Sequence, residues 1–589
     1  MNILGIVSET HDAGIALLAD GIPVAIIEEE RLNRQKHTGD FPTLALKEVF
    51  AVAGRRLADI DVITTPWNMS RLRRTAAKAV LGRLPASLSL LLQSAQPMQD
   101  RNIVFLNLLL RHHLKRQFRG QRLPPIVEVG HHESHAAIFF VSPFEEASVL
   151  VMDGYGDDAA TSTFTGTGNR LERQWHGTFF DSLGMIYTLV TRHLGFQLFE
   201  EGTVMALAAC GDTTYVDAMR DIVRLEPAGR FSINMEYFNH DRYGMLRPFK
   251  HRFIEKFGPA RVSGETLTDR HRDLAHALQA VTEDVVLHVT RHLAATYPSR
   301  NLVLTGGVAL NCVANARILR DTDFRRIWVP PCASDTGAPL GSALWHHHQT
   351  LGKARAFELT HAFHGLAYGP DQMRHALVRA GLEFEELDEA DLLPRVARDL
   401  AENRIVGWFQ GRFEMGPRAL GNRSILASPL RPEMRDLINA RIKYREPFRP
   451  FAPAVLAEHA GDYFDISQPD PFMTLAPRVR PDKVDVIPAA VHVDGTARIQ
   501  TVERASNPRY YALIEEFMKL TGVPVVLNTS FNKQEPVVAS PEEAISCFLR
   551  TEMDTLVLGN FYTRDRPAAV VARARSAFTV LDANTRGGE

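Results

Sequence analysis

Three histidines and a glutamate lie within five residues of the segment "GHHESHAA", which begins at Gly130. His131 and His135 are four positions apart, so on a helix both imidazoles would project from one face, with Cβ atoms about 5–6 Å apart. Paired imidazoles with this spacing bind metal ions on helices. A catalytic base with its helper, or an ordinary helix start rich in histidine, would show the same spacing. Other parts of the chain must therefore decide among the three.

Asp335 is a candidate third ligand, in the segment "PPCASDTGAPLGSALW". It follows an apolar stretch and precedes a helix of small residues, a position in which a carboxylate often caps the helix. Together with His131 and His135 it would instead form a set of two imidazoles and one carboxylate. That set leaves positions open for substrate oxygens and is typical of Fe²⁺, with Zn²⁺ also suited.

His11 and Asp12 lie in the first turn of the chain, within "SETHDAG". A histidine beside an aspartate is often ordinary turn chemistry. This turn, however, ends the opening strand, where a phosphate or a leaving group would bind. His11 is therefore predicted to be a general base that reaches the cleft.

A second set of candidates is cationic and lies between residues 407 and 502. These side chains interrupt apolar or turn segments, which suggests partly buried donors, and the planar fork of arginine suits phosphate or carboxylate. Structural ion pairs would account for two or three of them but not for all. The sequence therefore predicts an anionic ligand, such as a nucleotide triphosphate or an acyl phosphate. The cations are Arg412, Arg418, Arg423, Lys443, Arg445, Arg449 and Arg498, and "LNTSFN" adds Asn528, Thr529 and Ser530.

The composition bounds the kind of protein. A chain of 589 residues, 45% of them hydrophobic, is expected to form two or more domains. A net charge of −2 gives no reason to expect nucleic acid as a partner. The four cysteines are widely spaced without a CxxC pair, which fits a reducing cytoplasm. We expect no signal peptide and no membrane partner, because the apolar runs are too short to span a bilayer.

Three segments predict the elements that position the candidates. Residues 2–28 alternate apolar runs with small turns and predict a β-meander. Residues 147–168 repeat the theme around Asp153-Gly154, and residues 301–319 read as a strand, a Gly-Gly turn and a helix. Acidic, glycine-containing turns between such strands are the pattern of the actin-like ATPase fold, where backbone N–H groups approach phosphate closely.

Apolar periodicity weakens around residues 345–370, which predicts a boundary between domains 1–355 and 356–589. Residues 71–122 carry basic clusters around short leucine-rich runs and predict a basic helical insertion.

Ten segments that occur in order, from near residue 5 to about residue 560, resemble the O-carbamoyltransferases of the nodulation and antibiotic-tailoring type. That family includes the tobramycin, cephamycin and nodulation-factor carbamoyltransferases. The segments are "HDAGIALLADG", "EEERLNRQKH", "GHHESHAA", "VMDGYGD", "LTGGVALNCVANARI", "SDTGAPLGSAL", "GPRALGNRSILASP", "REPFRPFAPAV", "HVDGTARIQTV" and "LNTSFN".

The resemblance implies an α/β architecture with a Kae/TsaD-like, actin-type first domain and a YrdC-like second domain. In such enzymes the YrdC-like domain makes carbamoyl adenylate from carbamoyl phosphate and ATP, releasing phosphate and pyrophosphate. In the Kae-like domain an acceptor hydroxyl then attacks the carbamoyl carbon and AMP leaves. The implied acceptor is a small molecule, such as a sugar, an antibiotic or another natural product; the motifs specify neither its identity nor the oligomeric state.

The resemblance also implies roles for individual residues. His11 is the acceptor-side base, and a divalent metal, with Fe²⁺ favoured over Mg²⁺, Mn²⁺ and Zn²⁺, binds to His131, His135 and Asp335. The phosphate- and ribose-side loop positions are Asp153, Gly154, Gly306, Gly307 and Asn311. The carbamoyl phosphate and ATP residues are Arg418, Lys443, Arg449, Met473, Arg498, Asn528 and Ser530. His132 projects about 100° away from the ligand pair on a helix and is expected to be structural.

One segment departs from the family pattern. The family shows "EGKVMGLAPYG", whereas this chain has "EGTVMALAACG" from Glu201, with Thr203 in place of lysine and Cys210 in place of tyrosine. Substrate contacts of this stretch are therefore not carried over.

Two alternative functions remain open at this point. A tRNA threonylcarbamoyladenosine-type enzyme would share the fold, although the near-neutral charge and the domain order with "GPRALGNRS" argue against it. A metal-dependent hydrolase of the Kae-like fold would explain the histidines but not the arginine-rich second domain. A hydrogenase-maturation carbamoyltransferase should carry CxxC zinc fingers, and the sequence has none.

Overall fold

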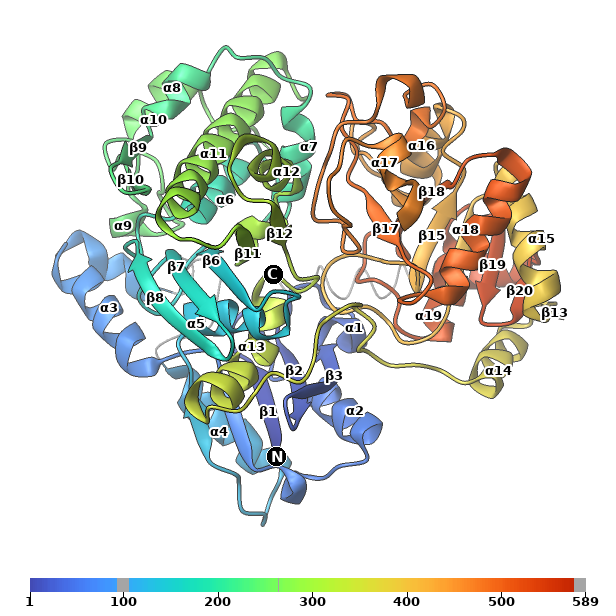
Figure 1. The fold of residues 1–589 in the computed structure, drawn as a ribbon, viewed down its shortest axis with the longest axis horizontal. Helices are drawn as coiled ribbons and strands as arrows, with labels where there is room; N and C mark the ends of the chain where they lie inside the picture. The colour runs from blue at the N-terminus through green and yellow to red at the C-terminus, as the bar shows by residue number, and fades with distance from the viewer. Residues whose placement is uncertain (93–104, 263, 577–589) are drawn as a thin grey trace. The chain divides into compact units, whose positions relative to one another are not determined.

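The computed structural model describes residues 1–92, 105–262 and 264–576. The chain forms two compact units, Met1–Leu359 and a second that begins at Thr360 (Figure 1). The sequence predicts the boundary between the two domains after residue 355. Residues 93–104 of the basic region 71–122 lie outside the described residues.

Two five-stranded sheets with the same topology form the centre of the first unit (Figure 1). In each, three consecutive strands pair antiparallel, and the first of them pairs parallel with the fourth strand of its sheet. One sheet has the order β3 (Ile22–Glu28), β2 (Gly14–Ala19), β1 (Asn2–Val7), β4 (Val62–Thr65) and β5 (Ile126–Glu128). The other has the order β8 (Arg170–His176), β7 (Thr161–Thr167), β6 (Glu146–Met152), β11 (Asn301–Thr305) and β12 (Arg326–Trp328).

These strands confirm the predicted meander at 2–28 and the predicted strand pair at 147–168. After β11 a 3-10 turn at Gly307–Leu310 leads into α12 (Cys312–Asp321), as the Gly-Gly turn predicted. The repeated topology supports an actin-type arrangement, and the prediction of a mixed α/β fold is confirmed.

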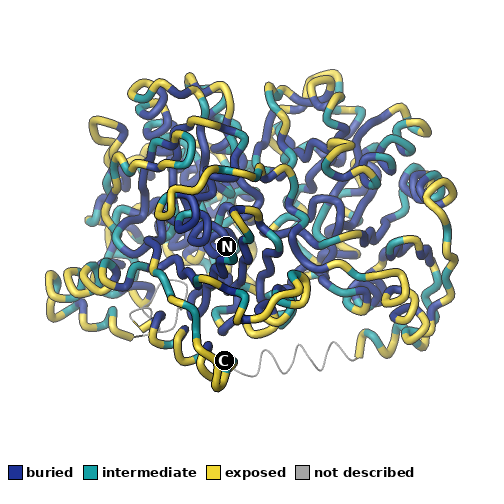
Figure 2. Tube along the Cα trace, turned by 60° about the horizontal axis from the view of Figure 1, so that its bottom comes forward, coloured by how far each residue is buried: buried dark blue, intermediate teal, exposed yellow. Residues whose placement is uncertain are grey.

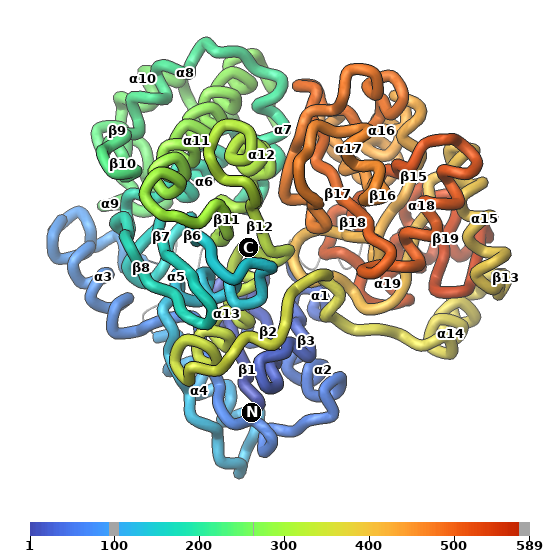
Figure 3. The backbone as a smooth tube through the Cα atoms, in the orientation of Figure 1, coloured from blue at the N-terminus to red at the C-terminus, as the bar shows by residue number. Residues whose placement is uncertain are grey.

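Helix α13 (Ala338–Leu344) packs against β1, β2 and α5 (His131–Ala136). In Figure 3, α13 lies beside β1, β2 and α5, although the green helices of the unit come between them in the sequence. The contact is close because glycines form it. A Cβ on Gly5 would lie 1.9 Å from the Pro339 carbonyl oxygen, and one on Gly341 would lie 1.9 Å from the Ser134 carbonyl oxygen. The small residues of "GAPLGSAL" thus let three backbones approach one another.

Further helices of the first unit surround these sheets, and α11 packs against α6, α7, α8 and α12. A two-stranded hairpin, β9 (Val223–Glu226) and β10 (Arg230–Ile233), lies beside α11. The helices are α1 (Glu30–Asn33), α2 (Thr43–Ala53), α3 (Met69–Leu81), α4 (Leu106–Gln117), α6 (Leu183–His193), α7 (Glu201–Ala208), α8 (Val216–Arg220), α9 (His240–Tyr243), α10 (His251–Phe257) and α11 (Asp269–Thr296).

The second unit contains a mixed eight-stranded sheet, with helix pairs α15–α18 and α14–α19 packed together. Its strands, in spatial order, are β13 (Glu385–Glu386), β20 (Phe561–Thr563), β19 (Thr555–Leu558), β14 (Val406–Phe409), β15 (Arg423–Ala427), β18 (Val525–Ser530), β16 (Ala452–Leu456) and β17 (Gln500–Val502). Its helices are α14 (Pro370–Ala380), α15 (Glu389–Ala401), α16 (Glu433–Ile438), α17 (Ala460–Tyr463), α18 (Pro508–Thr521) and α19 (Pro541–Arg550). The YrdC-like assignment of this unit stays a prediction.

Within each unit the buried residues gather inside, and the exposed ones follow outer helices and loops (Figure 2). Among the described residues, no helix is both long enough and apolar enough to cross a membrane.

Replacement of Gly341 by alanine tests the close packing of α13. The added methyl group would meet the Ser134 carbonyl oxygen of α5, so we expect a destabilisation of about 1–3 kcal/mol and a lower Tm by calorimetry. Gly202→Ala in α7 is the matched control, because nothing lies within 4 Å of its added Cβ. Equal Tm values for the two variants would contradict the packing described here.

Candidate metal and anion sites

His131, His135 and Asp335, the three predicted ligands, lie together in the first unit, and Asp153 joins them. Nε2 of His135 lies 3.3 Å from Nε2 of His131 and 3.2 Å from Oδ1 of Asp335. Oδ2 of Asp153 lies 3.1 Å from His131 Nε2 and 3.3 Å from His135 Nε2. His131 begins the short helix α5 and His135 lies in its last turn, whereas Asp153 follows β6 and Asp335 precedes α13.

The spacing of these atoms fits a single cation. Ligands about 2.0–2.1 Å from one ion lie about 3.3–3.4 Å apart in a tetrahedron and about 3.0 Å apart at adjacent octahedral corners. The contacts that join the two imidazoles to each other and to the carboxylates measure 3.1–3.4 Å. Two nitrogen and two oxygen donors suit Fe²⁺ or Zn²⁺ better than Ca²⁺, which prefers oxygen alone.

The electrostatics of the cluster also favour added positive charge. Burial disfavours imidazolium, but the carboxylates of Asp335 and Asp153 outweigh this effect and raise the pKa of His131 well above its usual value. Burial likewise disfavours a charged Asp153, yet the two imidazoles lower its pKa well below the usual range. Two carboxylates in one place, Asp335 buried and Asp153 nearly so, are therefore stable only with neighbouring cations, a role that a divalent ion would fill.

Surrounding contacts hold α5 in place. The backbone N–H of His131 donates to Asp157 Oδ1 at 2.9 Å, and its ring stacks on Trp67 with the ring centres 4.2 Å apart. His132 points away from the cluster, and its Nδ1 lies 2.8 Å from the Ser162 hydroxyl. That contact agrees with the structural role expected for His132.

His11, the predicted base, lies at the edge of the cluster, with Nε2 3.8 Å from Asp335 Oδ2. Its Nδ1 lies 3.2 Å from Asp12 Oδ2, and Asp12 Oδ1 lies 2.7 Å from Nδ1 of His37. The His37 ring stacks on Phe199 at 3.8 Å. Although burial opposes it, Asp12 raises the pKa of His37, and the two imidazoles lower the pKa of Asp12 below its usual range. Asp12 therefore links two imidazoles of which only one faces the cluster.

Two of the predicted loop positions, Gly306 and Gly307, form a tight turn, and a third, Asn311, begins a helix. Gly306 has φ +86°, and a Cβ there would lie 2.2 Å from the Met152 carbonyl oxygen, so only glycine fits. The Gly307 N–H donates to Asp153 Oδ1 at 2.9 Å, which ties this turn to the cluster. Asn311 caps α12 by accepting from the Ala314 N–H and pairs with the Gln279 amide. A nucleotide role for these positions stays a prediction.

In the second unit, Lys443 lies beside the end of β18. Its buried ammonium group donates to the Ser530 carbonyl oxygen at 2.6 Å and to the carbonyl and side-chain oxygens of Asn532, both at 2.8 Å. The Ser530 hydroxyl donates to Asn532 Oδ1 at 2.7 Å. The structure thus brings together Lys443 and Ser530, two of the predicted anion-site residues.

Three arginines form a cationic cluster in the same unit. Burial and the neighbouring charges of Arg449 and Arg498 lower the pKa of Arg445 to about 9. Among the described residues, nothing accepts a hydrogen bond from the buried Nε of Arg498. Mutual repulsion and an unsatisfied buried donor both favour a bound anion, because it would relieve each of them.

Two loops hold the remaining predicted residues. Met473 has φ +59° in a loop held by the buried carboxylate of Asp470, which accepts from the N–H groups of Thr474 and Leu475. Burial raises the pKa of Asp470 to about 6. Asn528 donates to the Ala419 carbonyl oxygen, which places it beside the loop that carries Arg418.

Two of the candidate cations have structural contacts. Arg423 is fully buried, donates to the carbonyl oxygens of Gln410 and Gly411, and lies over the Phe409 ring. Arg412 donates to the carbonyl oxygens of His364 and Gly365. The Gly-rich segments that predicted ligand binding thus also contain arginines whose hydrogen bonds run to backbone carbonyl oxygens.

Comparison with known proteins adds to this geometry. Residues 2–344 match the family described as carbamoyltransferase N-terminus, and residues 397–565 match carbamoyltransferase C-terminus. The chain belongs to the carbamoyltransferase family. It is 38% identical over 581 residues to the nodulation protein NolNO of Sinorhizobium fredii, over 97% of this chain and 81% of that protein. It is also 40% identical to an uncharacterized Synechocystis protein, over 95% of this chain and 96% of that one.

The match confirms that the chain is a carbamoyltransferase, as the ordered motifs predicted. Among solved structures, HypF from T. kodakarensis shares 11% identity over 60% of this chain and 48% of its own, at a TM-score of 0.31. That score is too low to establish a shared fold.

Sequence reasoning missed the contacts of two residues in the candidate site. Asp153, predicted as a phosphate-loop position, also contacts both histidines, a placement that depends on β6 ending beside α5. His37 lies in the quoted segment "EEERLNRQKH" but received no role. Its contact with Asp12, 25 positions away, could not be read from spacing.

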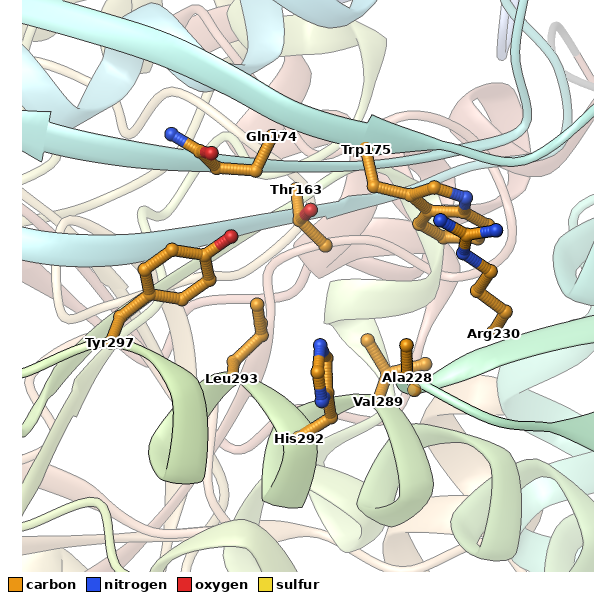
Figure 4. A pocket seen from close by; sticks show the side chains of 10 residues that line it. Thr163, Gln174, Trp175, Ala228, Arg230, Val289, His292, Leu293 and Tyr297 are labelled. Carbon is orange, nitrogen blue, oxygen red and sulfur yellow. The ribbon is translucent and has the colours of Figure 1, made fainter.

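A cavity of about 140 Å³ opens among β8, the β9–β10 hairpin and α11 (Figure 4). Trp175 and Arg230 lie on one side of it. His292 projects from α11, and Tyr297 is the residue that directly follows this helix. Its lining contains none of the predicted site residues, so the cavity is separate from the candidate sites.

Replacement of Asp153 by asparagine tests whether this residue is a metal ligand. The change removes a carboxylate charge from the cluster, so we expect bound metal, measured by elemental analysis, to fall to about a tenth or less of the wild-type content. Asp158→Asn is the matched control, because Asp158 pairs with Arg173 and is not a member of the cluster. Retention of full metal content by the Asp153 variant would exclude Asp153 as a ligand.

Proposed function

We propose that this carbamoyltransferase is an ATP-dependent O-carbamoyltransferase that works in two half-reactions, one in each unit. The second unit forms carbamoyl adenylate, and the first transfers the carbamoyl group to a hydroxyl of a small-molecule acceptor. The observation that carries this proposal is the cluster of Arg445, Arg449 and Arg498, whose mutual repulsion calls for anionic ligands. Carbamoyl phosphate and ATP are two such anions, and an acetyl- or methyl-group donor without phosphate would not need the cluster.

In the first half-reaction, water hydrolyses carbamoyl phosphate to carbamate and phosphate. A carbamate oxygen then attacks the α-phosphorus of ATP, and pyrophosphate leaves as carbamoyl adenylate forms. Arg498 and Arg449 would stabilise the charge that develops on the phosphoryl oxygens. Arg418, Met473, Asn528 and Ser530 would orient the two substrates, and Lys443 would hold the Ser530 end of β18 as well as offer charge. A YrdC-like assignment of the unit belongs to the same proposal.

In the second half-reaction, the acceptor hydroxyl attacks the carbamoyl carbon, the bond to the adenylate oxygen breaks and AMP leaves. His11 would take the hydroxyl proton, since it lies at the edge of the metal cluster and Asp12 orients its ring. A divalent cation, Fe²⁺ by our preference, would be held by His131, His135, Asp153 and Asp335. When bound, it would neutralise phosphate charge on the adenylate. The turn at Gly306 and Gly307 would border the same phosphate, although its N–H groups already donate to Ala333 and Asp153.

The division of labour can be tested by measuring the half-reactions separately. Arg498→Gln should lower pyrophosphate release from ATP and carbamoyl phosphate by about 100-fold or more, because it removes a donor to the developing charge. His135→Ala should leave most of that release intact and abolish the transfer step, followed as AMP release from supplied carbamoyl adenylate with a panel of hydroxyl compounds. Arg431→Gln, an exposed arginine of the second unit, is the control. If the Arg498 and His135 variants lost the same step, the two-site scheme would be wrong.

A second test concerns the pairing of His11 and His37 through Asp12. His37→Phe would keep the stack on Phe199 and remove the contact with Asp12. Since Asp12 would then be free to turn from His11, we expect kcat for transfer to fall roughly tenfold or more with little change in acceptor KM.

Pyrophosphate release by the His37 variant should be unaffected, because the first half-reaction belongs to the other unit. Gln35→Ala, an exposed change in the same segment, should behave as wild type. A rise in KM without a fall in kcat would assign His37 to acceptor binding instead.

A further inference from the structure

The basic insertion has a charge unlike that of the rest of the chain. Its described parts, residues 69–92 and 105–122, carry ten lysines and arginines, five in each part, and no aspartate or glutamate. The whole chain is nearly balanced, with 67 basic and 69 acidic residues. Arg71 and Arg83 pair with Glu133 and Asp241 of the same unit, and the remaining cations leave a local excess of positive charge along the two stretches.

The same two stretches also expose apolar side chains. They hold seven of the eighteen large hydrophobic residues that are exposed in the described part of the chain. Leu81 and Leu91 are each 68% exposed, and Leu108 is 64% exposed. Exposed leucines thus alternate with cations along both stretches, a combination that is typical of interaction surfaces. We name residues 69–92 and 105–122 the basic leucine face.

This face is fixed to the unit by its inner side. Met69 and Leu72 of α3 and Leu110 and Leu114 of α4 are buried. Glu128, at the end of β5, accepts from the Met69 N–H at 3.0 Å and from the Asn107 side-chain amide, so one carboxylate anchors the starts of both helices. The helices therefore already have a packed apolar side, and the exposed leucines are additional to it.

A further contact ties α4 to the first turn of the chain. His113 Nε2 lies 3.2 Å from Glu9 Oε1, and the His113 ring stacks on Phe41. Arg71 of α3 pairs with Glu133 of α5 at 2.5 Å. The basic leucine face is thus built on the same elements that carry His11 and His131.

We propose that the basic leucine face docks the enzyme on an anionic lipid surface. Lysines and arginines would contact phosphate headgroups, and the exposed leucines would enter the boundary between headgroups and acyl chains. A nucleic acid would use the cations but leave the leucines in water. A second copy of this chain would bring a second set of cations against the first. Lipid is the partner that uses both features at once, and surface docking needs no spanning helix.

Vesicle co-sedimentation of the full-length protein tests this proposal. We expect binding to vesicles of phosphatidylcholine with phosphatidylglycerol, little binding to phosphatidylcholine alone, and weaker binding as salt rises from about 50 to about 300 mM. Leu81→Ser with Leu91→Ser, and separately Lys78→Glu with Lys115→Glu, should each lower the affinity for anionic vesicles by about tenfold or more. All four positions are exposed, so the variants should fold, as a Tm near that of wild type would show.

Matched controls come from the second unit. Val493→Ser with Leu520→Ser and Arg379→Glu with Arg431→Glu change exposed residues of the same kinds and should bind vesicles as wild type does. Absence of binding to anionic vesicles, or equal loss in the controls, would overturn the proposal. So would tighter binding to an RNA oligonucleotide that only the charge variant weakens, or self-association in light scattering that the serine variant abolishes.

Discussion

The first unit depends on the passage of α13 between β1 and α5 with almost no side chain at the contacts. Gly5 meets the Pro339 carbonyl group and Gly341 meets the Ser134 carbonyl group, each at a distance that excludes even a methyl group. The Ser342 hydroxyl lies 2.9 Å from that of Thr64 on β4. Since α13 directly follows Asp335, and α5 carries His131 and His135, this packing sets how far the carboxylate lies from the imidazoles. The candidate metal cluster is therefore a consequence of backbone contact, and its members need no long, flexible side chains to meet.

The two units carry opposite and unbalanced charges at their candidate sites. In the first, Asp335, which is buried, and Asp153, which is nearly so, lie beside two imidazoles that they hold toward the protonated state. In the second, burial and like charges act against the Arg445 guanidinium. Neither arrangement is favourable for folding by itself, because buried charge costs more than surface charge. Under the proposed function, a ligand of opposite charge would relieve each of them, a cation in one unit and phosphorylated substrates in the other.

The sequence alone predicted the features that depend on local periodicity. The spacing of His131 and His135 required only the helical repeat, and the meander at 2–28 required only the alternation of apolar runs with turns. Asp153 and His37 were not predicted as partners of the cluster and of Asp12, because those contacts join segments that only the completed sheets bring together. Arg423 shows the converse limit. Its Gly-rich setting resembles that of a ligand-binding arginine, yet its hydrogen bonds run to backbone carbonyls, and only three-dimensional contacts separate the two roles.

The repeated topology of the two sheets explains why these particular residues converge. β1 and β6 occupy the same position in their sheets, each antiparallel to the next strand and parallel to a later one. The turn after β1 carries His11 and Asp12, and the turn after β6 begins with Asp153. Equivalent strand ends thus supply the proposed base and a proposed metal ligand, and Asp335 contacts both turns, at 3.8 Å from His11 and within the cluster that contains Asp153. A duplicated scaffold that presents two like strand ends can assign a different chemical task to each by changing only the residue types in the turns.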